Sequence, residues 1–308
     1  MYVYPDYYKD FHCIADKCIH NCCIGWDIDI DDDTAKYYSS INGEFGTRLF
    51  ENIDSNGVPH FVLDKNKRCP FLNENNLCDI MIHLGEDKVC EICAQHPRFY
   101  NEFEHHTECG IGLCCEEAAR LVLGKKDTTQ FLSEGNEVTI DIYTGLRNTA
   151  IHFMQDRSTA IPSRFNNIFS YFNISGFDID IKHWMKTLLQ LEILDGKWSN
   201  ILNECLRNLN QVDFHSFDTL MKNREQEYEQ FCVYLIYRHL ATAQSDNDFI
   251  ARIKFVKLAY YLLYTLGACK YTLTGIFTFE DQIDLARMFS SEIEYSEENI
   301  NTILDKLL

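Results

Sequence analysis

The spacing of apolar positions changes near residue 127. Beyond it, apolar residues recur three or four positions apart, which is the spacing of one buried face of an α-helix. Pro162 and the segment 173–178 predict loops, because proline and glycine interrupt this pattern. We therefore expect the second part of the chain to be all-helical. The pattern predicts helices within residues 137–157, 180–209, 217–243, 248–269 and 277–293.

Before residue 127 the pattern is mixed and favours short strands. The sequence WDIDID, residues 26–31, alternates apolar and acidic positions, which predicts a half-buried strand. Residues 60–82 predict short strands joined by a turn at NENN, residues 73–76. Residues 114–124 predict a helix, because two glutamates suit the positive end of its first turn and Gly124 can end it.

These patterns place the chain in the mainly α class. We expect an N-terminal cysteine-rich, metal-binding domain with short β-strands over residues 1–125, followed by an α-helical bundle over residues 126–308. The hydrophobic content is 46%, so a sizeable core can be buried without crosslinks.

The chain carries a formal net charge of −19, from 47 acidic and 28 basic residues. Such a surface repels nucleic-acid phosphates and anionic lipid, so we expect neither nucleic acid nor a membrane as a partner. It attracts basic partners, and a lysine-bearing protein substrate would fit it. Solubility alone also explains an acidic surface.

The location of the protein can be inferred from two stretches. The start, MYVYPDYYKD, has neither the basic region nor the apolar run of a signal peptide. The longest apolar stretch, residues 255–269, is interrupted by Lys257 and is too short to span a membrane. We therefore expect a cytoplasmic protein, in which thiols stay reduced.

The cysteines are concentrated toward the N-terminus, since eleven of the fourteen lie between Cys13 and Cys115. Cys205, Cys232 and Cys269 stand singly in helical patterns and are expected to be small buried residues. The eleven fall into three groups: Cys13, Cys18, Cys22 and Cys23; Cys69 and Cys78; and Cys90, Cys93, Cys109, Cys114 and Cys115.

In a reducing compartment, this many thiols indicate a metal rather than disulfides. Soft thiolates bind zinc or iron–sulfur clusters. The thiols are irregularly spaced and outnumber the ligands of one zinc ion, which favours a cluster, or a cluster with a second metal. One structural zinc with spectator thiols is the alternative. A disulfide between the neighbours Cys22 and Cys23 is a weaker third reading.

Several familiar enzyme motifs do not occur. The three-cysteine motif of radical S-adenosylmethionine enzymes fails because Gly25 stands where its third cysteine is needed. No glycine-rich turn joins a strand to a helix, so an ordinary Rossmann-type nucleotide site is not indicated. If the protein is an enzyme, the cysteine-rich region must carry or support the reaction.

Four motifs follow one another along the cysteine-rich region: cysteines leading to Gly-Trp, then CPFL with a later Leu-Cys, then a cysteine before Pro-Arg, then CxEAARL. In this order they resemble the flagellin lysine-N-methylase family, called FliB, over residues 11–123. They are also similar to a broader group of cysteine-rich zinc- or iron-chelating proteins. The matching residues are Cys13, Cys18, Cys22, Cys23, Gly25, Trp26, Cys69, Pro70, Phe71, Leu72, Leu77, Cys78, Cys93, Pro97, Arg98, Cys115, Glu117, Ala118, Ala119, Arg120 and Leu121.

The resemblance implies an iron–sulfur protein, with a 4Fe–4S cluster, that methylates lysines of flagellin or a similar protein with S-adenosylmethionine. Glu116 stands where the family pattern has proline, and Cys90, Cys109 and Cys114 are additional thiols. The number of metals, and which thiols share one, therefore stay open. The metal ligands that the resemblance implies are Cys13, Cys18, Cys22, Cys23, Cys69, Cys78, Cys93 and Cys115.

A lysine accepts a methyl group only as the neutral amine, so its site needs a base or a desolvating pocket. Aromatic walls suit a cationic side chain. Arg238 would bind the carboxylate of the methyl donor. No catalytic residue stands out, and aromatic residues at helical spacing more often belong to a core. The substrate-binding candidates are Trp26, Arg98, Tyr234, Tyr237 and Arg238.

Small-molecule sites favour domain interfaces, so we expect the donor to bind between the two predicted domains. Two functions remain open. One is an iron–sulfur-dependent protein lysine N-methyltransferase that acts on a lysine-bearing protein. The other is a non-enzymatic zinc- or iron-binding module that docks a basic partner.

Overall fold

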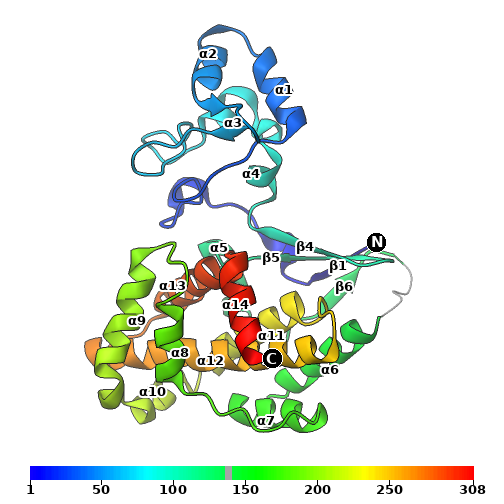
Figure 1. Ribbon diagram of the computed structural model, residues 1–308, viewed down its shortest axis with the longest axis vertical. Helices are drawn as coiled ribbons and strands as arrows, with labels where there is room; N and C mark the ends of the chain where they lie inside the picture. The colour runs from blue at the N-terminus through cyan, green and yellow to red at the C-terminus, as the bar shows by residue number, and fades with distance from the viewer. Residues whose placement is uncertain (136–140) are drawn as a thin grey trace. The chain divides into compact units, whose positions relative to one another are not determined.

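A computed structural model describes residues 1–135 and 141–308. The chain forms two compact units. The cysteine-rich unit comprises His12–Phe99, and the helical unit comprises Met1–Phe11 with Tyr100–Leu308. Helices dominate the described residues and the strands are short, so the predicted mainly α class is confirmed (Figure 1).

The cysteine-rich unit packs short helices and extended segments around a small apolar core. Asp31 caps α1, because its carboxylate accepts a hydrogen bond from the Thr34 amide at 2.9 Å. Ile28, Phe61 and Phe71 are among the residues of this core. The elements of the unit are α1 (Asp32–Ser40), α2 (Gly43–Glu51), β2 (Ile53–Asp54), β3 (His60–Phe61), α3 (Asp79–Leu84), α4 (Glu91–Gln95) and the start of β4 (Arg98–Glu102).

Two predicted strands of this unit are only partly right. In WDIDID, Ile28 and Ile30 are buried while Asp27 and Asp29 are exposed, so the alternation is confirmed. The segment is not a regular strand, however, because it pairs through an isolated bridge between Asp29 and residue 60. Residues 79–82, predicted as extended, form the start of α3 instead.

The turn predicted at NENN is confirmed. The Asn73 amide donates to the Leu77 carbonyl at 2.9 Å. The Asn73 side chain in turn accepts hydrogen bonds from the amides of Asn75 and Leu77. This local competition for backbone groups is typical of asparagine in turns.

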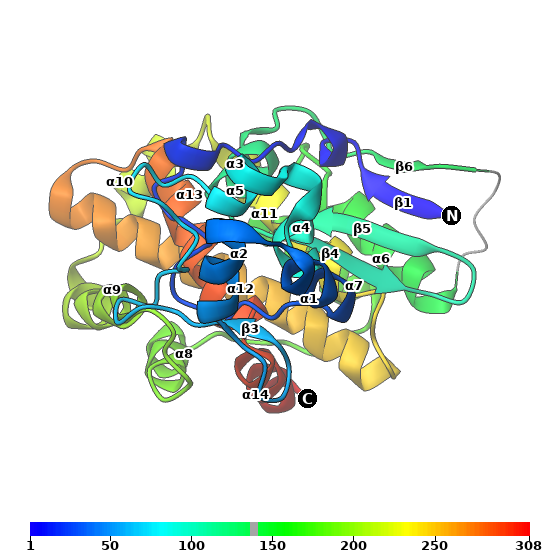
Figure 2. The same ribbon diagram turned by 90° about the horizontal axis from the view of Figure 1, so that it is seen from above.

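The helical unit combines a four-stranded sheet with the C-terminal helices. The strand order is β4-β5-β1-β6, with β1 parallel to β5 and antiparallel to β6 (Figure 2). The strands are β1 (Tyr2–Pro5), β4, β5 (Thr107–Ile111) and β6 (Phe131–Ser133). The α-helices are α5 (Glu116–Gly124), α6 (Ile142–Met154), α7 (Ile161–Tyr171), α8 (Ile181–Leu188), α9 (Gly196–Asn208), α10 (Phe214–Met221), α11 (Glu225–His239), α12 (Asp246–Thr274), α13 (Phe279–Phe289) and α14 (Glu297–Leu307), with a π-helical turn at Ser290–Glu294.

The long helix α12 is the centre of the helical unit (Figure 1). Ser245 caps its N-terminus, and Gly275 ends it in the left-handed conformation that favours glycine. The helix contacts α8, α9, α10, α11, α13 and α14. It is therefore buried on several sides rather than along one stripe.

The five segments predicted to contain helices do contain them, although residues 137–140 lie outside the described residues. Residues 173–178 form no regular element, as predicted, and α5 ends at Gly124. The loop predicted at Pro162 is wrong. Pro162 lies in the first turn of α7, where its missing amide hydrogen is not needed and its fixed φ suits the helix.

The compact units do not follow the predicted boundary between residues 125 and 126. Residues 1–11 and 100–125 belong with the helices, because β1 pairs with both β5 and β6. Helix α5 also packs on α11 and α13. The boundary was predicted from the distribution of cysteines along the chain, which carries no information about pairing between distant strands.

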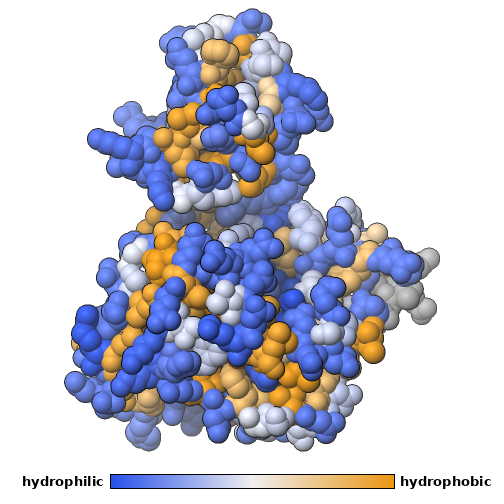
Figure 3. Space-filling model, in the orientation of Figure 1, coloured by the Kyte–Doolittle hydropathy of each residue, from blue (hydrophilic) through white to orange (hydrophobic). Residues whose placement is uncertain are grey.

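On the face shown in Figure 3, hydrophilic residues dominate and apolar residues form small patches. Among the described residues, no helix is both long and apolar enough to cross a membrane.

Candidate functional site

Five thiols lie in or against one core of the cysteine-rich unit. Cys69 and Cys90 are buried in it, and Cys23, Cys78 and Cys93 pack against it. The Cys69 amide donates to the Cys23 carbonyl at 2.9 Å, which holds these two segments together. Cys78 and Cys90 immediately precede α3 and α4, and Cys93 lies within α4. The five residues are hereafter called the thiol core.

Thiols of this unit interact in pairs. A hydrogen bond between Cys90 and Cys93 lowers the pKa of Cys90 and raises that of Cys93. The pair Cys22 and Cys23 behaves in the same way, with the pKa of Cys22 lowered. Burial raises the pKa of Cys69 to about 11. A bound metal would hold the ligating sulfur atoms as thiolates, because it displaces their protons.

The structure groups the predicted ligands unevenly. Cys23, Cys69, Cys78 and Cys93 join the thiol core, and Cys22 contacts it through Cys23. Cys13 is exposed, and the Cys18 thiol donates to the His20 carbonyl at 3.3 Å. Cys115 belongs to the helical unit, where it precedes α5.

Cys90 was left out of the predicted ligands, yet it is the most buried member of the thiol core. The signal for Cys90 in the sequence is its spacing to Cys93, since only two residues separate the two cysteines. The other two additional thiols, Cys109 and Cys114, lie in the helical unit. Burial raises their pKa values to about 11 and about 12.

The chemistry of the thiol core fits a soft metal or an iron–sulfur cluster, since both are held by thiolates. The side-chain arrangement, however, does not form a metal-coordination site. Within residues 1–135 and 141–308, no three His, Cys, Asp or Glu side chains are arranged to hold a metal ion.

The predicted substrate residues fall into both units. Trp26 and Arg98 belong to the cysteine-rich unit, and Tyr234, Tyr237 and Arg238 to the helical unit. The Trp26 indole donates to the Cys22 carbonyl at 2.5 Å, and its ring centroid lies 5.9 Å from that of His96. Trp26 is thus beside the first thiols, as the sequence indicates. Arg98 begins β4.

Arg238 lies in a buried cluster of polar groups. It donates to the Tyr234 hydroxyl at 2.6 Å and lies 3.5 Å from the Glu294 carboxylate. Glu294 also lies 2.7 Å from His239 Nε2. Burial alone would raise the pKa of Glu294, but Arg238 and His239 hold it below its ordinary value. A donor carboxylate at Arg238 would therefore compete with Glu294.

Tyr237, on α11, is hydrogen-bonded to the backbone of the sheet. Its hydroxyl lies 3.0 Å from the Val3 carbonyl and 3.1 Å from the Cys109 carbonyl. Its ring stacks on Phe131 with centroids 4.6 Å apart, and the Arg147 guanidinium lies 4.9 Å from its centroid. Tyr237 thus has the contacts of a core residue, although its role toward a substrate stays a prediction.

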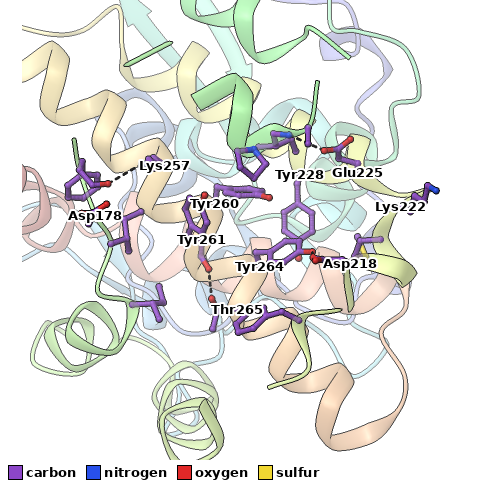
Figure 4. Close-up of a pocket in the computed structure, with 18 residues that line it drawn as sticks. Asp178, Asp218, Lys222, Glu225, Tyr228, Lys257, Tyr260, Tyr261, Tyr264 and Thr265 are labelled. Carbon is purple, nitrogen blue, oxygen red and sulfur yellow. Dashed lines mark hydrogen bonds between the residues drawn. The ribbon is translucent and has the colours of Figure 1, made fainter. Parts of the chain in front are cut away.

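A cavity of about 770 Å³ lies within the helical unit and was not predicted (Figure 4). Its aromatic wall is made of Tyr228 from α11 and Tyr260, Tyr261 and Tyr264 from α12. The starts of α7 and α11, helix α10 and residues 177–181 complete it. We call it the tyrosine pocket. The sequence feature that could have indicated this pocket is the group of tyrosines within residues 255–269. Because the stretch is otherwise apolar, it was interpreted only as a buried helix.

Charged groups lie at both ends of the tyrosine pocket. Figure 4 shows Lys257 and Asp178 at one end and Glu225 and Lys222 at the other, with the tyrosine rings between them. The Lys257 ammonium donates to the Phe177 carbonyl at 3.1 Å. The tyrosine pocket therefore has an aromatic middle and polar ends.

The helical unit matches a known family. Residues 164–308 match the FliB lysine N-methylase C-terminal domain. This segment holds the tyrosine pocket except for its lining residues Ala160, Ile161 and Pro162. It contains the Arg238 cluster as well.

Curated relatives agree with this match. The flagellar biosynthetic protein FliU of Salmonella muenchen is 25% identical over 171 residues, which are 51% of this chain and 94% of FliU. Lysine-N-methylases of Salmonella choleraesuis and Salmonella typhimurium are each 26% identical over 137 residues, or 40% of this chain. That region spans 32% of each lysine-N-methylase, about a third of its length. No solved structure matches the chain.

Proposed function

We propose that the chain is a member of the FliB lysine N-methylase family and a protein-lysine N-methyltransferase that uses S-adenosylmethionine. The observation that carries the proposal is the match of residues 164–308 to the family domain. The acceptor would be flagellin or a similar lysine-bearing protein. The similarity of the chain to a flagellar biosynthetic protein and to lysine-N-methylases supports this choice of acceptor.

The proposed reaction is a direct transfer of one methyl group. The lone pair of a neutral lysine amine attacks the sulfonium methyl carbon, and the carbon–sulfur bond breaks with its electron pair going to sulfur. S-adenosylhomocysteine leaves as a neutral thioether, and the new methylammonium loses a proton to water or a base. The acceptor lysine must be neutral beforehand, so desolvation of its ammonium is part of catalysis.

We propose an iron–sulfur cluster, with zinc as the alternative, as the metal group of the cysteine-rich unit. The thiol core supports this, since four of its five members are among the predicted ligands. Cys13, Cys18 and Cys22 remain proposed as further ligands of this group, and Cys115 remains proposed as a metal ligand in the helical unit. When bound, the group would stabilise a unit whose own core is small, because binding to the folded form alone adds to folding free energy.

The acidic charge supports a lysine-bearing acceptor. A net charge of −19 attracts a basic surface and raises its rate of encounter. We propose that the reaction takes place in the cytoplasm, where reduced thiols are available to bind metal.

The proposal is tested with protein purified without oxygen. We expect incubation with methyl-labelled S-adenosylmethionine and flagellin to add label to lysines, located by peptide mass spectrometry. Flagellin with acetylated lysines is the control, because it offers no amine. No transfer by metal-replete protein would refute the proposal for flagellin, and no transfer to any lysine-bearing protein would refute the activity. A visible absorption band with matching iron and sulfide would favour the cluster, and a colourless zinc protein the alternative.

A further inference from the structure

The tyrosine pocket has the size and position of a small-molecule site. Pockets for such ligands have volumes of about 300–1,000 Å³ and combine apolar walls with a few polar groups. The volume here, about 770 Å³, lies in that range and far exceeds a single lysine side chain. Almost all of its lining lies in the segment that matches the family domain.

The aromatic wall is preorganised. The Tyr228 centroid lies 5.7 Å from that of Tyr260 and 5.2 Å from that of Tyr264. The Tyr260 and Tyr261 rings meet edge to face with centroids 5.0 Å apart. Tyr264 donates a hydrogen bond to Asp218, which orients its ring at the rim. Burial raises the pKa values of Tyr260 and Tyr264, so the phenols stay neutral. Neutral rings attract cations and stack on planar bases.

One end of the pocket suits an amino-acid group. Lys257 uses one hydrogen bond on the Phe177 carbonyl, and an ammonium has three N–H donors, so it keeps capacity for a carboxylate. Asp178 lies at the same end of the pocket and can accept hydrogen bonds from a ligand ammonium (Figure 4). Lys257 is held in place, since its ammonium also lies 4.6 Å from the centroid of Phe169.

The other end suits neutral donors. Glu225 is held by the Ile161 amide at 3.0 Å and lies 3.7 Å from Arg164. Carboxylates of this kind accept hydrogen bonds from sugar hydroxyls. The lining carries two lysines, Lys222 and Lys257, and three acidic residues, so it offers partners for both the carboxylate and the ammonium of an amino-acid group.

We propose that the tyrosine pocket binds the methyl donor of the reaction, a sulfonium nucleoside with an amino-acid end. The amino-acid end lies at Lys257 and Asp178, the sulfonium and the base lie along the tyrosine rings, and the sugar lies toward Asp218 and Glu225. This inference rests on the proposed function for the identity of the ligand. It places the donor within one unit instead of between the two predicted domains.

The test is calorimetric titration of the full chain with S-adenosylmethionine and with S-adenosylhomocysteine, which lacks the sulfonium charge. Lys257→Met should raise both Kd values about 10- to 100-fold, because it removes a charge-assisted hydrogen bond. Tyr261→Leu should raise the Kd for S-adenosylmethionine about 2- to 5-fold and that for S-adenosylhomocysteine less, because the cation–π contact is lost.

Lys254→Met is the matched control. Lys254 lies on the same helix, is partly buried and donates to the Leu307 carbonyl at 2.6 Å, but it does not line the pocket. Its Kd values should stay within about 2-fold of the wild type. Hydrogen exchange on the wild type provides a test without mutation, since S-adenosylmethionine should protect residues 177–181 and 257–265.

The pocket assignment and the proposed function can fail separately in these experiments. The pocket assignment would be overturned if Lys257→Met bound S-adenosylmethionine as tightly as the wild type does, or if the donor protected only other segments. The proposed function would still stand in that case if the wild type transferred methyl groups. Protection of the pocket by a lysine peptide and not by S-adenosylmethionine would also overturn the pocket assignment, because the pocket would then hold the acceptor. A wild type that neither binds the donor nor transfers methyl would refute both.

Discussion

Replacing Arg238 with alanine should destabilise the helical unit, whatever it does to a donor. The Glu294 side chain is fully buried and lies 3.5 Å from the Arg238 guanidinium. Removing one member of a buried ion pair costs about 3–5 kcal/mol, because the other charge stays without compensation. We expect about 3 kcal/mol, the lower end of that range, because His239 and Tyr234 still contact Glu294.

The cost should depend on pH in a defined direction. In the wild type the pKa of Glu294 is held below its ordinary value, 4.5. The ionised carboxylate therefore contributes stability above pH 4.5, which is lost as the pH falls through its folded pKa. Without Arg238, burial prevails and Glu294 takes up a proton at higher pH. The stability difference between wild type and Arg238→Ala should therefore shrink as the pH falls from 7 toward 4.5.

Urea unfolding followed by far-ultraviolet circular dichroism measures this cost, since the helical unit dominates that signal. Glu294→Gln removes the uncompensated charge, so the double variant should regain about 1–2 kcal/mol over Arg238→Ala alone. A cost below about 1 kcal/mol, or no gain in the double variant, would refute the assignment of a structural ion pair. Donor titration of the folded double variant then tests the predicted role of Arg238 toward a substrate.

Three further predictions follow from the packing and the charge. Cys69→Ala should lose bound iron and sulfide, whereas Cys232→Ala, which is also buried but lies in the helical unit, should keep them; equal metal content would remove the thiol core as the ligand set. Gly267→Ala should destabilise the protein by about 1–3 kcal/mol in thermal or urea unfolding, because its Cβ would lie 2.9 Å from Phe217 Cζ; an unchanged midpoint would show that the rings can move aside. Association with a basic acceptor should weaken as salt rises, because salt screens surface charge, and an affinity independent of salt would contradict the electrostatic steering.

Helices were predictable where one face is buried and the other is exposed. Helix α9 shows this, since Trp198, Leu202 and Cys205 are buried at helical spacing while Asn203 and Glu204 are exposed. The sheet was not predictable in the same way. Residue pairing between β1 and β5 joins Tyr2 to Thr107, and no local pattern specifies a partner so far along the chain.

The candidate sites show the same limit. Cysteine spacing indicated that thiols would gather, and four of the eight predicted ligands lie in or against one core together with Cys90, which the family pattern omits. The tyrosine pocket was hidden because α12 contacts neighbours on several sides. Its tyrosines therefore resemble ordinary core residues in the sequence. Which of them line a cavity depends on α7 and α10, whose packing is a tertiary property.

The proposed membership of the FliB family rests on two parts of the chain that do not overlap. The cysteine motifs lie within residues 11–123, whereas the matched family domain covers residues 164–308. The two parts are independent observations, because the thiols proposed to bind a metal and the pocket tyrosines lie in different compact units. A metal-binding module alone would need only the first part. The matched helical domain contains an aromatic pocket in the size range of small-molecule sites, and this supports the proposed enzyme over the module.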